Sequence, residues 1–155
     1  MANSERAGLA TADVIAAAAV AAGDAAYHWQ PQSDALVWSA NAAEVLGITD
    51  PALIASGRGF ARFFDPDNAA NRYDTIMQSA EIDAGQGVPF SLEYRIKPKG
   101  REAADSAWVE DQGRWFAGPD GRPGEVLGVV RRIDARQQRD ARLKYLSDCD
   151  ALTGL

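Results

Sequence analysis

The stretch Val88-Pro-Phe-Ser-Leu-Glu-Tyr-Arg-Ile-Lys97 decides the fold of this chain. Apolar and mostly polar side chains alternate along it, and this alternation predicts a strand with one buried face. Two more strand-like runs follow at residues 107–117 and 125–133, and the Gly- and Pro-rich segment 118–124 between them predicts a tight reversal. We therefore expect three neighbouring antiparallel strands with one apolar face, which the upstream part of the chain must cover.

The upstream part of the chain predicts a helix, two short strands and then further helices. The expected segments are a helix over 11–22, strands over 25–30 and 35–39, and short helices over 40–46 and from residue 51. A longer helix is expected over 66–83, with Asp65 as its cap and Pro66 as its first residue. Two strands in front and three behind must share one sheet, because an isolated two-stranded ribbon is only marginally stable. The prediction is an α+β fold, in which a five-stranded antiparallel sheet carries helices on one face, with an N-terminal helix and a C-terminal linker helix added.

Composition limits the classes of function. The 155 residues are 46% apolar, which suits one domain with a real core. Sixteen basic and 22 acidic residues give a net charge of −6, and no basic cluster lies over exposed aromatics, so neither nucleic acid nor a membrane surface is an expected partner. The single cysteine, Cys149, excludes an internal disulfide and a multi-cysteine metal site and fits a reducing, cytoplasmic compartment.

An ordered set of motifs runs through the middle of the chain. The motifs are Tyr27-His-Trp29, Val37-Trp-Ser-Ala-Asn-Ala-Ala-Glu-Val-Leu-Gly47, Phe63-Phe-Asp-Pro-Asp67, Leu92-Glu-Tyr-Arg-Ile96, Trp108-Val-Glu-Asp-Gln-Gly-Arg114 and the strand 128–134. In order and spacing they resemble a PAS domain of the kind found in bacterial signalling proteins, a PAS fold-3-like sensor. The chain departs from that family at Gln30, where Asp is common, and at Arg132-Ile-Asp134, which replaces the usual Asp-Ile-Thr. The polar contacts that clamp the exit helix are therefore expected to differ.

The last six residues carry a second resemblance. Asp150-Ala-Leu-Thr-Gly-Leu155 is similar to the opening of a GGDEF domain, the cyclic-di-GMP synthase module. The expected organisation is an N-terminal helical cap (1–24), a PAS domain (25–134), a linker helix (135–149) and the start of a truncated GGDEF domain (150–155). The two resemblances imply a sensory fragment that regulates a C-terminal cyclic-di-GMP synthase or phosphodiesterase. Synthesis and degradation stay open, because a degenerate GGDEF domain ahead of an EAL phosphodiesterase would begin in the same way.

Apolar positions at helical spacing predict a homodimer. In the N-terminal helix one stripe of small apolar residues is expected to pack either on its own domain or on the same helix of a second chain. The linker helix begins at a capping Asp with Gln three residues later, and one apolar pair at seam spacing follows it. The candidate dimer and signalling residues are Val14, Ile15, Ala18, Ala21, Asp134, Leu143 and Leu146.

A pocket between the longer helix and the sheet would be lined by Tyr73, Ile76, Met77, Phe90, Leu92 and Trp108. The same residues would also fill a core without a ligand, and the sequence favours the filled core. No catalytic or metal site is predicted, and the fragment is not expected to be an enzyme. Glu110 and Asp111, the one adjacent carboxylate pair in a strand, must point to opposite faces.

The family resemblance implies cofactors that this chain is not equipped to hold. Haem-binding relatives use a histidine on the longer helix, whereas the only histidine here, His28, is expected in a strand. Cysteinyl-flavin relatives need a cysteine beside the flavin, whereas Cys149 falls in the linker. We therefore expect no cofactor. Two alternatives remain beside the regulatory role: a platform that docks a response regulator or a proteolytic adaptor, and a sensor of a small metabolite.

Overall fold

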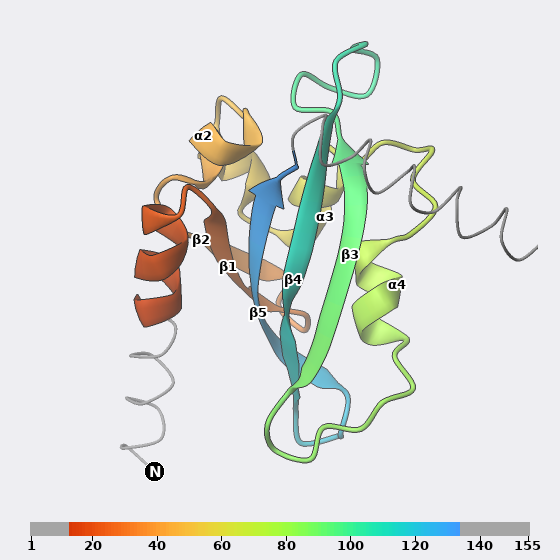
Figure 1. The fold of residues 1–155 in the computed structure, drawn as a ribbon. Helices are drawn as coiled ribbons and strands as arrows, with labels where there is room; N and C mark the ends of the chain where they lie inside the picture. Colours follow the sequence, from red (N-terminus) through yellow and green to blue (C-terminus); the bar gives the residue numbers. More distant parts are fainter. Residues whose placement is uncertain (1–12, 134–155) are drawn as a thin grey trace, which may run out of the picture.

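The computed structural model describes residues 13–133, and its centre is a five-stranded antiparallel sheet in the order β2-β1-β5-β4-β3 (Figure 1). The strands are β1 (Ala25–Gln30), β2 (Ala35–Trp38), β3 (Val88–Ile96), β4 (Ala107–Ala117) and β5 (Pro123–Arg132). The last strand, β5, therefore lies in the middle of the sheet, between β1 and β4. The predicted α+β fold with five antiparallel strands is confirmed.

The strand predicted from the alternation of apolar and polar residues forms as β3, with its apolar side facing the core. Val88, Leu92, Tyr94 and Ile96 are buried on the inner face of the sheet, whereas the residues between them are exposed or half-buried. Strand β3 pairs with β4 along its whole length, from Val88 opposite Trp115 to Ile96 opposite Ala107. The pairing fixes which β4 residues share the inner face, because residues opposite each other in an antiparallel pair point to the same side.

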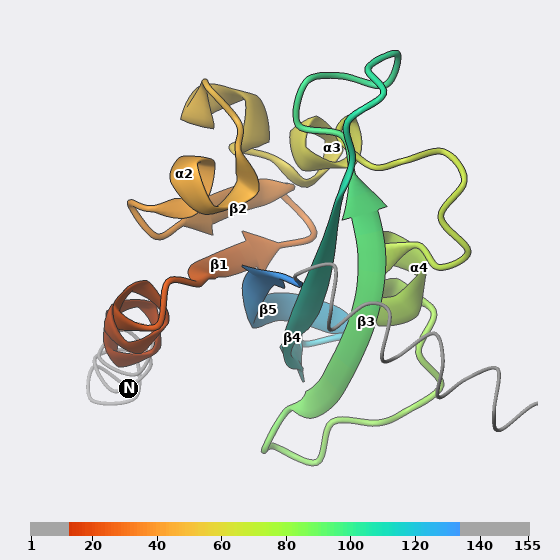
Figure 2. The same cartoon turned by 45° about the horizontal axis from the view of Figure 1, so that its top comes forward.

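Four short helices cover this inner face, namely α2 (Ala42–Leu46), the 3-10 helix η1 (Pro51–Ile54), α3 (Gly57–Ala61) and α4 (Arg72–Met77). Local signals set their ends: Asp50 caps η1 through the backbone N–H of Ala52, and Gly47 ends α2 with a φ of 72°. Figure 2 shows α2 beside β1 and β2 and α4 beside β3, with α3 between them, and the N-terminal helix (residues 13–21, red) apart from all three beside the start of β1.

The prediction of a longer helix over 66–83 is wrong, because α4 spans only Arg72–Met77. Asn71 caps α4 by accepting hydrogen bonds from the backbone at its start. Upstream, the side chain of Asn68 donates to the backbone oxygen of Arg95 at 2.9 Å and accepts from its nitrogen at 2.8 Å. These contacts tie the loop to the end of β3, and a helix beginning at residue 66 would break them.

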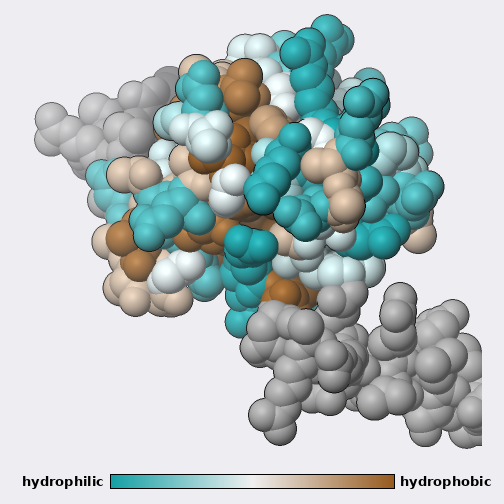
Figure 3. All heavy atoms as spheres, turned by 90° about the horizontal axis from the view of Figure 1, so that it is seen from above, coloured by the Kyte–Doolittle hydropathy of each residue, from teal (hydrophilic) through white to brown (hydrophobic). Residues whose placement is uncertain are grey.

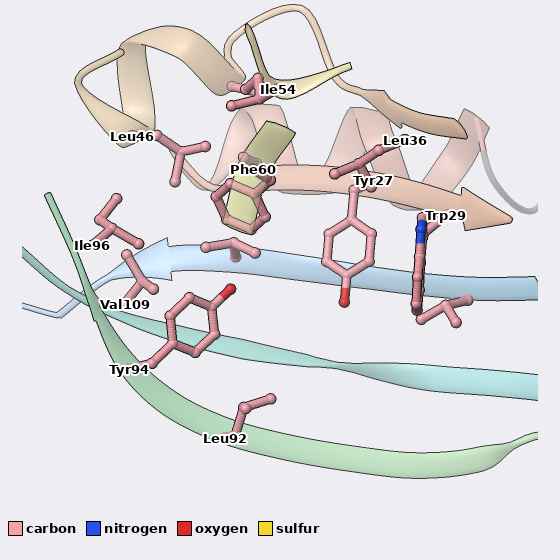
Figure 4. Close-up of a cluster of buried hydrophobic side chains, with 14 of the residues drawn as sticks. Tyr27, Trp29, Leu36, Leu46, Ile54, Phe60, Leu92, Tyr94, Ile96 and Val109 are labelled. Carbon is pink, nitrogen blue, oxygen red and sulfur yellow. The ribbon is translucent and has the colours of Figure 1, made fainter. Parts of the chain in front are cut away.

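The core lies between the sheet and the short helices and is rich in aromatic side chains. Figure 4 shows Tyr27 from β1, Phe60 from α3 and Tyr94 from β3 pointing into this space. Phe60 is fully buried and packs edge-on against Phe64, with ring centroids 4.9 Å apart. The core residue Trp29 closes one end of the cluster and lies near the turn between β1 and β2.

The surface of the domain is mixed. Seen from above, it is largely hydrophilic (teal) and is interrupted by patches of apolar residues (brown) (Figure 3). Within residues 13–133, each helix is too short or too polar to cross a lipid bilayer.

Candidate functional site

A charged pair lies inside the apolar core. Arg72, the first residue of α4, is 4% exposed, and Asp111 in β4 is fully buried. Nε of Arg72 lies 3.1 Å from Oδ2 of Asp111. The hydroxyl groups of Tyr27 and Tyr94 also donate hydrogen bonds to this carboxylate, at 2.6 and 2.8 Å. Side chains from β1, β3 and α4 therefore converge on one carboxylate of β4.

The period of β4 explains why Asp111 points inward. Ala107, Val109, Asp111 and Trp115 all lie on the buried face, and the paired strands keep that face against the helices. Glu110 lies on the other face, where it pairs with Arg131 at 3.4 Å. The prediction that these two adjacent carboxylates face opposite sides is thus confirmed.

Burial and mutual charge shift the pKa of all four groups. Burial, reinforced by the charge of Asp111, raises the pKa of both Tyr27 and Tyr94 well above the ordinary value, so their hydroxyls stay protonated and donate hydrogen bonds to Asp111. Burial also raises the pKa of Asp111, although the charge of Arg72 and the hydrogen bonds oppose this. Burial works against the charge of Arg72, but the attraction of its neighbours raises the pKa of this guanidinium overall.

Aromatic rings surround the Arg72 guanidinium. Its Cζ atom lies 4.6 Å from the ring centroid of Tyr27, 4.8 Å from that of Trp29 and 5.9 Å from that of Phe60. Contacts of this kind stabilise a cation that has been removed from water. Its Nη2 atom, although buried, donates no hydrogen bond to any part of the chain that the structure describes.

A cleft of about 910 Å³ opens beside this cluster. Its walls come from the β1–β2 turn, α3, the loop that precedes α4, and the side chains of Trp29, Arg72 and Tyr73. Asp34 in the turn fixes one wall, because its carboxylate accepts from Nε1 of Trp29 and from the backbone N–H of Arg58, both at 3.0 Å. The cleft thus has one wall that is held by hydrogen bonds, and the nearly buried Arg72 borders it.

The residues predicted to line a pocket do not share one cavity. Ile76 and Leu92 are buried in the packed core, and Met77 packs against it. Tyr73 is 55% exposed and borders the cleft beside Arg72, with its ring 6.0 Å from that of Trp29. Phe90 is half-buried against the core and also reaches the rim of a groove on the outer face.

Trp108 does not join the predicted pocket, because it points to the opposite face of the sheet. It stands across from Arg95 in the pairing of β4 with β3. The guanidinium of Arg95 lies 5.5 Å from its ring centroid on this outer side. The physical reason is the two-residue period of a strand, which separates Trp108 from the buried Val109.

The outer face of the sheet carries a second hollow, a groove of about 750 Å³ lined by residues of β3, β4 and β5 and by Ile15. Ile15 is half-buried and Ala19 is 5% exposed, so one side of the N-terminal helix packs on its own domain. The predicted stripe of Val14, Ala18 and Ala21 is exposed. The other predicted signalling residues, Asp134, Leu143 and Leu146, lie outside the described residues, as do the linker helix and the GGDEF-like end.

Sequence reasoning missed Arg72 and Asp111. The sequence did contain a signal that Asp111 is buried. At the two-residue spacing of a strand, this carboxylate falls on the same face as the apolar Ala107, Val109 and Trp115. A helix that started at residue 66 placed Arg72 on the solvent side, so nothing drew attention to it. Among residues 13–133, no three His, Cys, Asp or Glu side chains lie close enough together to hold a metal ion.

Comparison with known proteins places this architecture in a family. Residues 35–130 match the family described as PAS fold. No curated protein matches the chain. Similar solved structures include a sensory box histidine kinase/response regulator from Burkholderia thailandensis, with 19% identity and a TM-score of 0.56 over 89% of this chain and 96% of that one.

Two further structures are similar at the level of the fold. The N-terminal domain of a diguanylate cyclase with PAS/PAC sensor from Marinobacter aquaeolei is 15% identical, with a TM-score of 0.55 over 70% of this chain and 94% of that one. A light-oxygen-voltage domain is 16% identical, with a TM-score of 0.56 over 84% of this chain and 92% of that one. Because the family match spans more than half of the sequence, the chain belongs to the PAS family of sensor domains.

Proposed function

We propose that this chain is a dimeric, cytoplasmic regulatory module that controls a C-terminal cyclic-di-GMP synthase or phosphodiesterase and performs no catalysis itself. The observation that carries the proposal is the GGDEF-like hexapeptide Asp150–Leu155, which follows the PAS domain after a charged segment of helical pattern. The similar PAS domain at the N-terminus of a Marinobacter diguanylate cyclase supports this pairing of sensor and output.

The outer face of the sheet supports the dimer. Two apolar features lie on this side of the domain: the groove beside Ile15, and the exposed stripe of Val14, Ala18 and Ala21 on the N-terminal helix. A second copy that covers this region removes apolar surface from water, which contributes about 25 cal/mol per Å². A symmetric pair of this kind places the two copies of β5 close to each other.

The position of β5 gives a route for the signal. This strand pairs with β1 on one side and β4 on the other, and the backbone N–H of Ile133 still donates to the oxygen of Trp108 at 2.9 Å. The strand that precedes Asp134 in the sequence is therefore held in the middle of the sheet. A change in sheet curvature or dimer packing would move the start of the predicted linker helix and the two output domains attached to it.

A sensor of a small metabolite is the second candidate, and the cleft beside Arg72 favours it. The two candidates are compatible, since a ligand in the cleft would supply the signal that the dimer transmits. A docking platform for another protein would instead use the outer groove without any ligand.

The test uses the full gene product that carries this sequence. We expect it to synthesise cyclic-di-GMP from GTP or to hydrolyse it, and we expect Ile15→Glu to change that activity at least about fivefold by weakening the dimer. Leu53→Glu is the matched control, because Leu53 is also apolar and 50% exposed but lies on η1, in the helical layer. A gene product without either activity would rule out the proposed output.

A further inference from the structure

We propose that the cleft beside Arg72 binds a small carboxylic acid, with the ligand carboxylate against the free edge of the Arg72 guanidinium. This inference deepens the sensory part of the proposed function and rests on it. It names the chemical class of the signal, which neither the family match nor the similar structures supply.

The buried guanidinium of Arg72 has hydrogen-bond donors without an acceptor in the part of the chain that the structure describes. A guanidinium carries five N–H donors, and in this one neither Nε, which lies 3.1 Å from Oδ2 of Asp111 as an ion pair, nor Nη2 makes a hydrogen bond within residues 13–133. The side chain is 4% exposed and borders the cleft. Buried polar groups in proteins are nearly always hydrogen-bonded, so this edge of Arg72 calls for acceptor oxygens from outside the chain.

Charged side chains of both signs border the cleft. Its two carboxylates are already engaged: Asp34 accepts from Trp29 and from the backbone of Arg58, and Asp65 pairs with Arg95 at 3.5 Å. The side chains of Arg58 and Arg101, which also border the cleft, form no salt bridge within the described part of the chain. Within the described residues, the cleft therefore carries two guanidinium groups without an ion pair against one carboxylate, that of Asp34, without a cationic partner, and this excess of positive charge favours an anion.

The position of Asp111 favours a carboxylate ligand over a phosphate. Asp111 lies 3.1 Å from the same guanidinium, so a dianion at this place would meet a second negative charge at close range. A carboxylate carries a single charge and presents two coplanar oxygens that match a guanidinium edge. The rings of Trp29, Phe64 and Tyr73 border the rest of the cleft, and its volume lies in the range of small-ligand sites. An acid with a compact aromatic body can pack on these rings, among the polar side chains that form the rest of the walls.

The site is connected to the exit of the domain. Arg72 belongs to α4, and its partner Asp111 belongs to β4, which pairs with β5 along most of its length. A ligand that tightens the hold on Arg72 would therefore act on the strand that leads to the linker.

The experiment titrates the 155-residue chain with benzoate, with the uncharged benzamide and with inorganic phosphate. The readout is the indole N–H resonance of Trp29, assigned with Trp29→Phe. We expect benzoate to shift this resonance saturably and to bind at least about tenfold tighter than benzamide or phosphate. We expect Arg58→Gln and Arg101→Gln to weaken benzoate binding by about twofold to fivefold without changing the fold.

The decisive variant is Arg72→Gln with Asp111→Asn, which removes both buried charges together and so avoids leaving one of them unpaired. We expect it to fold and to bind benzoate at least about tenfold more weakly. Arg131→Gln, on the outer face, is the matched control and should bind as the parent does.

Three results would overturn the inference: no shift of the Trp29 resonance up to about 10 mM benzoate, equal affinity for benzamide or phosphate, or unchanged binding in the double variant. Because the titration measures binding by this chain alone, a negative result leaves the control of cyclic-di-GMP turnover standing. A gene product without cyclic-di-GMP activity would equally leave the titration result standing.

Discussion

Arg72 and Asp111 lie 3.1 Å apart, from Nε to Oδ2, in a core that is otherwise apolar. They join the helical layer to the sheet, since Arg72 begins α4 and Asp111 lies in the middle of β4. The hydroxyls of Tyr27 and Tyr94 donate hydrogen bonds to the same carboxylate. Each charge is buried, so each depends on the other for its compensation.

This dependence predicts a non-additive pattern of stability. Arg72→Met leaves Asp111 buried without its cation, and Asp111→Leu leaves Arg72 without its anion, so each should lower the free energy of unfolding by about 3–5 kcal/mol. The double variant should recover most of that loss, because no buried charge remains. Urea unfolding of the four proteins measures the coupling directly. A loss of unfolding free energy in the double variant that equals the sum of the two single losses would show that the pair is not coupled.

The carboxylate of Asp83 predicts a pH-dependent contribution to stability. It accepts hydrogen bonds from the backbone N–H groups of Ala117, Gly85 and Gly87, at 2.9, 2.8 and 2.8 Å, and these bonds lower the pKa of Asp83. A lowered pKa means that the contribution is present above the unfolded value, near 3.8, and is lost as the pH falls through the folded value. Asp83→Asn should therefore lower the Tm at pH 7.

The same comparison at pH 3 supplies the check. The difference in Tm between the parent and Asp83→Asn should shrink there, because pH 3 lies below the unfolded value near 3.8, so that proton uptake by the unfolded chain begins to favour unfolding. Asp67→Asn, at an exposed position in the loop before α4, should behave as the parent does at both values of pH. A difference in Tm for Asp83→Asn that is the same at pH 7 and pH 3 would contradict the assignment.

The close pairing of β4 with β5 predicts that Gly113 tolerates no side chain. Gly113 stands opposite Gly128, and a Cβ atom at Gly113 would overlap the backbone oxygen of Leu127. Gly113→Ala must push the two central strands apart, so we expect a loss of about 1–3 kcal/mol in urea unfolding. The neighbouring exposed residue gives the control, Gln112→Ala, for which we expect a change within about 0.5 kcal/mol. A Gly113→Ala protein as stable as that control would refute the close approach.

The strands could be predicted from the sequence because their signals are local. The two-residue alternation of β3 identifies its buried face without any knowledge of what packs there. Helix α4 could not be predicted in the same way. The Asp65-Pro66 pair is a strong start signal, but the contacts of Asn68 with the backbone of Arg95 override it. Those contacts join residues 27 positions apart and leave no mark in the local pattern.

The candidate site depended on both kinds of information. The placement of Trp108 in a pocket was wrong because the strand was recognised but its phase was not followed residue by residue, and the same phase places Asp111 inside. Arg72 depended on where α4 begins, which the sequence misplaced by six residues, from 66 to 72. The pairing of these two residues follows only from the packing of α4 against the sheet.

The proposal that this chain acts as a dimer through the outer face of its sheet is tested most directly by its mass in solution. Sedimentation equilibrium should give twice the mass of the 16.6 kDa chain for the parent and for Leu53→Glu. Ile15→Glu should give a folded monomer, because it places a charge at the apolar groove. A parent chain that stays monomeric at about 100 μM, or a dimer that Ile15→Glu leaves intact, would contradict it.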